Sequence, residues 1–120
     1  MFQGLRTVVM RAEDLEKAKA WYASLLGIAP YFDTPYYVGF NVGGYELGLH
    51  PGGKEMWDGV DSLTYWGVSD IAAAHARLLE LGATAYQPIE DVGGGIRLAT
   101  VRDPFGTMVG IIENPHFKIQ

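Results

Sequence analysis

The same order of elements occurs twice along this chain of 120 residues, and this repetition limits the possible folds more than any other feature. Each half contains a strand, a helix that follows an Asp and ends near a Gly, and at least two further strands. A unit of about 55 to 60 residues buries too little of its sheet face to be stable alone. We therefore expect an α+β chain that forms one domain, residues 1–120, from two modules, about residues 1–57 and 58–120.

The first module is predicted to begin with a strand over residues 5–10 and a helix from Leu15 to Gly27. Asp14 is a suitable N-cap, and a glycine suits the end of a helix because it tolerates positive φ. One face of the helix collects the apolar residues Leu15, Ala18, Trp21, Tyr22, Leu25 and Leu26. We expect this face, with Trp21 and Tyr22, to lie in the core.

Two strands over residues 36–42 and 45–50 follow, joined by the two-residue turn Gly43-Gly44. This turn fixes the register, so that Asn41 lies opposite Glu46. Directly opposed residues share a face, and one face of the hairpin is apolar enough to lie beneath the helices. The other face is polar and relieved by glycine; it carries Tyr37, Gly39, Asn41, Glu46, Gly48 and His50.

The second module is predicted to contain a strand over residues 62–68, Asp70 as an N-cap, and a helix up to Gly82. Two strands over 96–102 and 108–112 then flank a turn that contains Asp103-Pro104-Phe105-Gly106. With Arg102 opposite Thr107, one face would carry Arg97, Ala99, Val101, Met108, Gly110 and Ile112.

Composition excludes several classes of protein. Fourteen acidic residues against nine Lys and Arg give a net charge of -5, and the basic residues form no cluster, so we expect no nucleic-acid partner. The chain has no cysteine, which excludes disulfides and thiolate metal sites. Since no apolar run has the length of a signal peptide or a membrane span, we expect a cytoplasmic protein without membrane contact.

Four segments together resemble the vicinal oxygen chelate superfamily, which includes glyoxalase I, extradiol dioxygenases, fosfomycin-resistance enzymes and bleomycin-binding proteins. They are residues 7–15 with the aromatic pair Trp21-Tyr22, the segment 45–47 after the hairpin, the segment 66–70, and Asp103-Pro-Phe-Gly106. The resemblance spans most of the chain. It implies two βαβββ modules paired into an open curled barrel around a central cleft, within a homodimer.

Metal-dependent members of that superfamily take ligands from four strand positions, which the resemblance places at Thr7, Glu46, Thr64 and Gly110. Of these, only Glu46 is a good ligand, because a hydroxyl binds divalent ions poorly and glycine has no side chain. Such ions need three or four donors. We therefore expect no metal and no other cofactor, and we expect glyoxalase or dioxygenase chemistry to be absent.

The sequence favours a small-molecule-binding protein over an enzyme, similar to the drug-sequestering relatives of the bleomycin-resistance type. A carboxylate in an aromatic-lined cleft suits an aromatic or cationic ligand, since an unpaired buried charge is costly. The predicted ligand-binding residues are Tyr37, Asn41, Glu46, His50, Trp57, Thr64, Trp66 and Arg97.

Two alternatives stay open. In the first, the protein is a lyase or isomerase of the glyoxalase type, with Glu46 as general base and Tyr37, Asn41 or His50 orienting the substrate. In the second, it is a divergent metal enzyme that uses Glu46 and His50. Four predicted residues also have structural alternatives: Trp66 in an interface, Trp57 in a dimer contact, Arg97 in a surface ion pair, and His50 as an edge residue.

Overall fold

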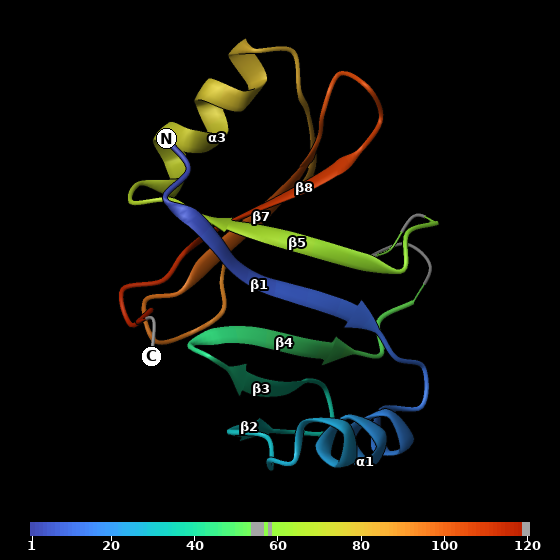
Figure 1. The fold of residues 1–120 in the computed structure, drawn as a ribbon. Helices are drawn as coiled ribbons and strands as arrows, with labels where there is room; N and C mark the ends of the chain where they lie inside the picture. Colours follow the sequence, from blue (N-terminus) through green and yellow to red (C-terminus); the bar gives the residue numbers. More distant parts are fainter. Residues whose placement is uncertain (54–56, 58, 119–120) are drawn as a thin grey trace. The chain divides into compact units, whose positions relative to one another are not determined.

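The computed structural model describes residues 1–53, 57 and 59–118. Its described residues form two helices and eight strands with both parallel and antiparallel pairing, which confirms the α+β fold (Figure 1). The chain divides into two compact units. We name them after their helices: the α1 unit contains residues 7–62 and Lys118, and the α3 unit contains residues 1–6 and 63–117.

In the α1 unit, β3 pairs antiparallel with β2 and with β4, and β1 pairs parallel with β4. The predicted hairpin register is confirmed from Val42 opposite Tyr45 to Val38 opposite Leu49. Both turn glycines have positive φ, 63° at Gly43 and 93° at Gly44, as the two-residue turn requires. The elements are β1 Gly4–Arg11, of which this unit holds the part from Thr7, α1 Leu15–Leu26, β2 Phe32–Asp33, β3 Val38–Val42 and β4 Tyr45–His50.

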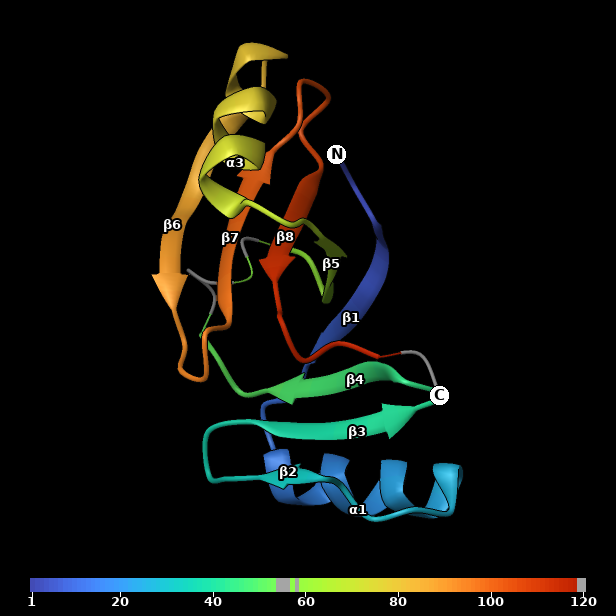
Figure 2. The same ribbon diagram turned by 90° about the vertical axis from the view of Figure 1, so that its left-hand side faces the viewer.

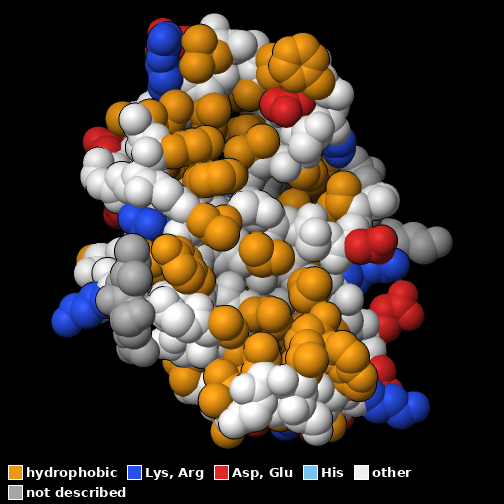
Figure 3. Space-filling model, viewed as in Figure 1, with side chains coloured by type: hydrophobic (Ala, Val, Ile, Leu, Met, Phe, Trp, Pro, Cys, Tyr) orange, Lys and Arg blue, Asp and Glu red, His pale blue; other side chains and the backbone are white. Residues whose placement is uncertain are grey.

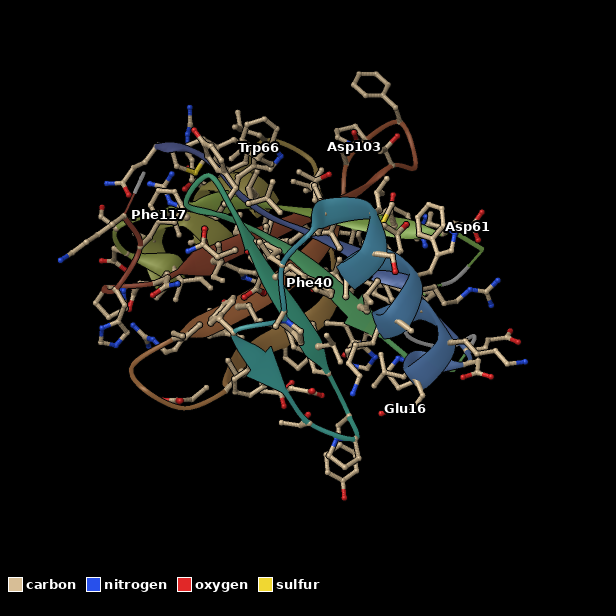
Figure 4. All side chains as sticks on the ribbon, turned by 60° about the horizontal axis from the view of Figure 1, so that its bottom comes forward. Glu16, Phe40, Asp61, Trp66, Asp103 and Phe117 are labelled. Carbon is tan, nitrogen blue, oxygen red and sulfur yellow. The ribbon has the colours of Figure 1, made fainter. Side chains whose placement is uncertain are left out.

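Helix α1 begins and ends where the sequence predicts. The carboxylate of Asp14 accepts a hydrogen bond from the Lys17 amide, and Gly27 ends the helix with a φ of 69°. The helix lies against the apolar face of β3 and β4, and Figure 4 labels Phe40 among the side chains there. The buried residues of this core are Ala12, Leu15, Val38, Phe40 and Leu49.

The expected burial of Trp21 is wrong. Its side chain is 60% exposed, whereas Tyr22 is partly buried and donates a hydrogen bond to the Met10 sulfur over 3.2 Å. The stripe of apolar residues on α1 is wider than the contact that β3 and β4 offer, so Trp21 and Leu25 stay outside it. Figure 3 shows hydrophobic side chains at the surface where α1 lies.

In the α3 unit, β5 pairs parallel with β8, and β7 pairs antiparallel with β8 and with β6. Asp70 caps α3 as predicted, by accepting a hydrogen bond from the Ala73 amide. The helix packs against β7 and β8 (Figure 2) through Val68, Ile71, Ala74, Ala99 and Ile111. The elements are β5 Ser62–Gly67, α3 Ile71–Glu80, β6 Thr84–Asp91, β7 Arg97–Arg102 and β8 Met108–Glu113.

The predicted register of β7 with β8 is wrong by one residue, because Arg102 lies opposite Met108 and not Thr107. Thr107 belongs to the turn: its carbonyl accepts the Asp103 amide and its own amide donates to the Asp103 carboxylate. Gly110 therefore shares a face with Thr100, whereas Arg97 falls on the opposite face.

Strands β2 and β6 are absent from the sequence-based prediction. Strand β2 has two residues, too few for a periodic pattern. Strand β6 contains Pro88 and has register shifts on both sides of Gln87. Proline is tolerated there because β6 is the outermost strand of its unit. Among the described helices, none is long and apolar enough to cross a membrane.

Candidate functional site

The carboxylate of Glu46 on β4 is held by two phenols. Tyr31, just before β2, donates its hydroxyl hydrogen bond to Oε1, and Tyr37, just before β3, donates to Oε2. Burial, followed by the hydrogen bond and the charge of Glu46, raises the pKa of Tyr31, so its hydroxyl remains a donor at neutral pH. Each carboxylate oxygen thus has one bound donor and further lone pairs for a ligand.

Two glycines make room for this cluster. A Cβ on Gly48 would overlap the Tyr37 hydroxyl and lie 2.6 Å from its Cζ. A Cβ on Gly39 would lie 3.0 Å from Oε1 of Glu46 and 3.4 Å from Cε1 of Tyr31. The predicted polar face with glycines is confirmed. Because Gly39 and Gly48 have no side chains, Glu46 and both phenols can approach one another.

A line of rings continues from the carboxylate along the α1 unit. Neighbouring ring centroids are 6.1 Å apart from Phe32 to Tyr37, 6.1 Å from Tyr37 to His50, and 6.3 Å from His50 to Trp57. These spacings lie in the range of edge-to-face aromatic contacts. Glu46 is therefore a carboxylate at the side of an aromatic surface.

His50 acts as a fixed ring in this line. Its Nδ1 accepts a hydrogen bond from the Gly52 amide over 2.8 Å, which assigns the proton of the neutral ring to Nε2. Burial lowers the pKa of His50, so the neutral form prevails at pH 7. Trp57 beside it is 1% exposed, and its indole Nε1 has no hydrogen-bond partner among the residues that the structure describes.

Asn41, a predicted ligand-binding residue, and Thr7, a position that the resemblance equates with a metal ligand, both have structural partners in this unit. Asn41 accepts a hydrogen bond from the Gly44 amide over 2.8 Å and so closes the hairpin turn. Thr7 is 7% exposed and lies directly opposite Glu46 in the parallel β1–β4 pair. Two of the four positions that the resemblance equates with metal ligands are therefore neighbours in the sheet.

In the α3 unit, the residue that pairs with Gly110 is Tyr65, not the neighbouring Thr64. Tyr65 is 4% exposed, and burial, with a smaller effect of the Glu90 charge, raises its pKa to about 12. Thr64 and Trp66 alternate with Tyr65 and so point to the other side of β5. Trp66 shares that side with Ile111 and stacks on Phe2 with ring centroids 5.5 Å apart.

Arg97 is paired with a carboxylate. Its guanidinium contacts Glu113 at 3.0 Å, and the same carboxylate accepts the Ile71 amide at the start of α3. The hydrogen bond from the Ile71 amide and, to a smaller extent, the one from Arg97 lower the pKa of the Glu113 carboxyl. Arg97 thus occupies the surface ion pair that the sequence left open as an alternative, and its contact with a ligand stays a prediction.

A divalent metal does not fit the residues present. A Cβ on Gly110 would lie 2.6 Å from the Tyr65 ring and 2.8 Å from the Thr64 carbonyl oxygen, so this position has no space for a ligand side chain. Glu46 already accepts two phenols. Within residues 1–53, 57 and 59–118, no three His, Cys, Asp or Glu side chains gather into a group that could hold an ion.

Sequence reasoning missed Tyr31, Phe32 and Tyr65. The segment with Tyr31 and Phe32 lies outside the regular pattern of the predicted strands, and only its aromatic content next to the hairpin could have drawn attention to it. Tyr65, which lies opposite Gly110, was not among the predicted residues, because the prediction named its neighbour Thr64.

Comparisons with known proteins agree with this fold. The model of the Glyoxalase/Bleomycin resistance protein/Dioxygenase superfamily matches residues 4–111. A Streptomyces coelicolor methylmalonyl-CoA epimerase variant is 13% identical with a TM-score of 0.78, covering 96% of this chain and 99% of its own. A superfamily member from Vibrio splendidus 12B01 is 20% identical with a TM-score of 0.68, covering 91% and 97%.

A Legionella pneumophila protein described as an NAD-dependent benzaldehyde dehydrogenase is 16% identical with a TM-score of 0.68, covering 93% of this chain and 98% of its own. No curated protein matches the sequence. At these identities the solved structures show a shared fold and not a shared activity. Because the family model covers most of its length, the chain belongs to the Glyoxalase/Bleomycin resistance protein/Dioxygenase superfamily.

Proposed function

We propose that this protein is a metal-free binding protein for a small organic cation, which it holds at Glu46. The observation that carries the proposal is a carboxylate fixed by Tyr31 and Tyr37 at the side of an aromatic surface. No Lys or Arg forms an ion pair with Glu46 in the described part of the chain. A ligand can therefore supply the positive charge.

The surrounding rings favour an organic cation over a metal ion. A cation within about 6 Å of an aromatic face gains roughly 0.5 to 2 kcal/mol, and quaternary ammonium groups are often bound in this way. Tyr31 is 63% exposed and Phe32 48% exposed, so a ligand can reach the rings beside Glu46. Sequestration of a cationic compound requires no bond chemistry, in keeping with the drug-binding members of the superfamily.

The arrangement supports binding more than proton transfer. A general base must take a proton from the substrate, whereas a cation needs only the negative charge of Glu46, which the two phenol hydrogen bonds leave in place. His50 has its Nδ1 occupied by the Gly52 amide. The methylmalonyl-CoA epimerase with the same fold is an enzyme, so an isomerase that uses Glu46 stays the alternative. The homodimer and the cytoplasmic location stay predictions from the sequence.

Glu46→Gln tests the proposal, because it keeps the shape of the side chain and removes its charge. We expect choline to bind the wild-type protein in an NMR titration and to bind Glu46→Gln at least tenfold more weakly, about 1.4 kcal/mol. Glu80→Gln changes an exposed carboxylate of α3 and should bind as the wild type does.

A neutral carbon isostere of choline, in which carbon replaces the nitrogen, completes the design. Equal binding of choline and the isostere would contradict a charge-based site. Unchanged choline affinity in Glu46→Gln would also contradict the charge-based site. If Glu46→Gln kept this affinity but lost an enzymatic activity of the wild type, the proton-transfer alternative would be favoured.

A further inference from the structure

Arg6, in the first half of β1, is a cation of the α3 unit with no carboxylate partner among the described residues. In the described part of the chain, Arg11, Arg77 and Arg97 each lie within 4 Å of a carboxylate. No carboxylate pairs with Arg6 there, although its side chain is partly buried. An uncompensated charge that is partly removed from water is unfavourable.

The guanidinium is nevertheless held in one orientation. Its Cζ lies 3.9 Å from the centroid of the Phe117 ring, a cation–π contact. A Cβ on Gly67 would lie 2.7 Å from Cζ and 2.9 Å from Nη2, so the guanidinium takes the space that a side chain on β5 would fill. Its Nη1 donates to the Leu5 carbonyl over 3.3 Å. Figure 4 labels Phe117 and, from the same unit, Trp66.

These contacts orient Arg6 but use few of its donors. A guanidinium has five N–H groups in a planar fork, and the described contacts engage one of them in a hydrogen bond. Because Phe117 covers a face of the guanidinium, the N–H groups at its edge can still donate hydrogen bonds. A pre-oriented fork of this kind matches the oxygens of a carboxylate or a phosphate in a bidentate pair.

We infer that Arg6, with Gly67 and Phe117, forms a binding site for an oxyanion, the carboxylate or phosphate group of a small molecule. The site uses residues of the α3 unit alone and does not depend on the organic-cation site at Glu46. The glycine at position 67 has a specific role in it, since a Cβ there would collide with the guanidinium in its present position.

The test is an NMR titration of the full chain with inorganic phosphate and, separately, with acetate, both at constant ionic strength maintained with chloride. We expect a saturable shift of signals from residues around Arg6 with at least one of the two anions. Arg6→Gln should weaken this binding at least fivefold. Arg77→Gln is the matched control, because Arg77 is an exposed arginine paired with Glu80, and it should bind as the wild type does.

The two arms separate the sources of the oxyanion: a response to phosphate alone indicates a phosphate group, and a response to acetate indicates a carboxylate. Gly67→Ala gives a second test, since it displaces the guanidinium while keeping its charge, and it should also weaken binding. No saturable response to either anion, or equal affinities in wild type and Arg6→Gln, would overturn the inference. Neither outcome bears on choline binding at Glu46.

Discussion

Gly110→Ala is expected to lower the free energy of unfolding by about 1–3 kcal/mol, the usual cost of adding a methyl group to a filled core. The new Cβ would lie 2.6 Å from the Tyr65 ring and 2.8 Å from a backbone oxygen of Thr64. The ring could move by itself, but the carbonyl belongs to β5 and would take the strand with it. Urea denaturation of both proteins measures the difference.

Gly53→Ala is the control for this measurement, because a Cβ there meets no atom of the other described residues within 4 Å and the glycine has no positive φ. Its stability should stay within about 0.5 kcal/mol of the wild type. Gly110→Glu, which places a carboxylate at a position that the resemblance equates with a metal ligand, should destabilise the fold further and not create a metal site. A Gly110→Ala protein as stable as the wild type would show that the space is open after all.

Gly48→Ala is expected to have the largest effect on ligand binding apart from changes to Glu46 itself. The added methyl group overlaps the Tyr37 hydroxyl, so the phenol must leave Glu46. A hydrogen bond to a charged group contributes about 1.5–3 kcal/mol. We therefore expect the choline affinity to fall by more than tenfold. The free energy of unfolding should fall by about 1.5–3 kcal/mol.

Tyr37→Phe identifies the cause of this loss, because it removes the same hydrogen bond and leaves the glycine in place. It should weaken choline binding about as much as Gly48→Ala does. If Gly48→Ala bound choline as the wild type does, then Tyr37 would not be the residue that orients Glu46, and the proposed site would need a different basis.

Local sequence patterns predicted the elements that local chemistry fixes. Asp14 and Asp70 cap their helices, and the Gly43-Gly44 turn sets the hairpin register, because each involves residues close in the chain. The face that carries Glu46 followed directly from that register. These signals need no knowledge of distant contacts.

The errors occurred where distant residues decide the outcome. The register of β7 with β8 depends on hydrogen bonds of Asp103 within its turn, which the sequence of the turn does not specify uniquely. Tyr31, just before β2, is placed beside Glu46 by a contact with β3, in which its amide donates to the Gly39 carbonyl. The exposure of Trp21 depends on how much of α1 the strands cover. Periodicity alone cannot report such tertiary contacts.

The most direct test of the central claim is a metal-binding measurement on the purified, dialysed protein. Calorimetric titration with Zn²⁺, Mn²⁺ and Ni²⁺ should give no stoichiometric binding, because Glu46 is engaged by Tyr31 and Tyr37 and Gly110 has no room for a ligand. One equivalent of a divalent ion, bound by the wild type and lost in Glu46→Gln, would contradict the account.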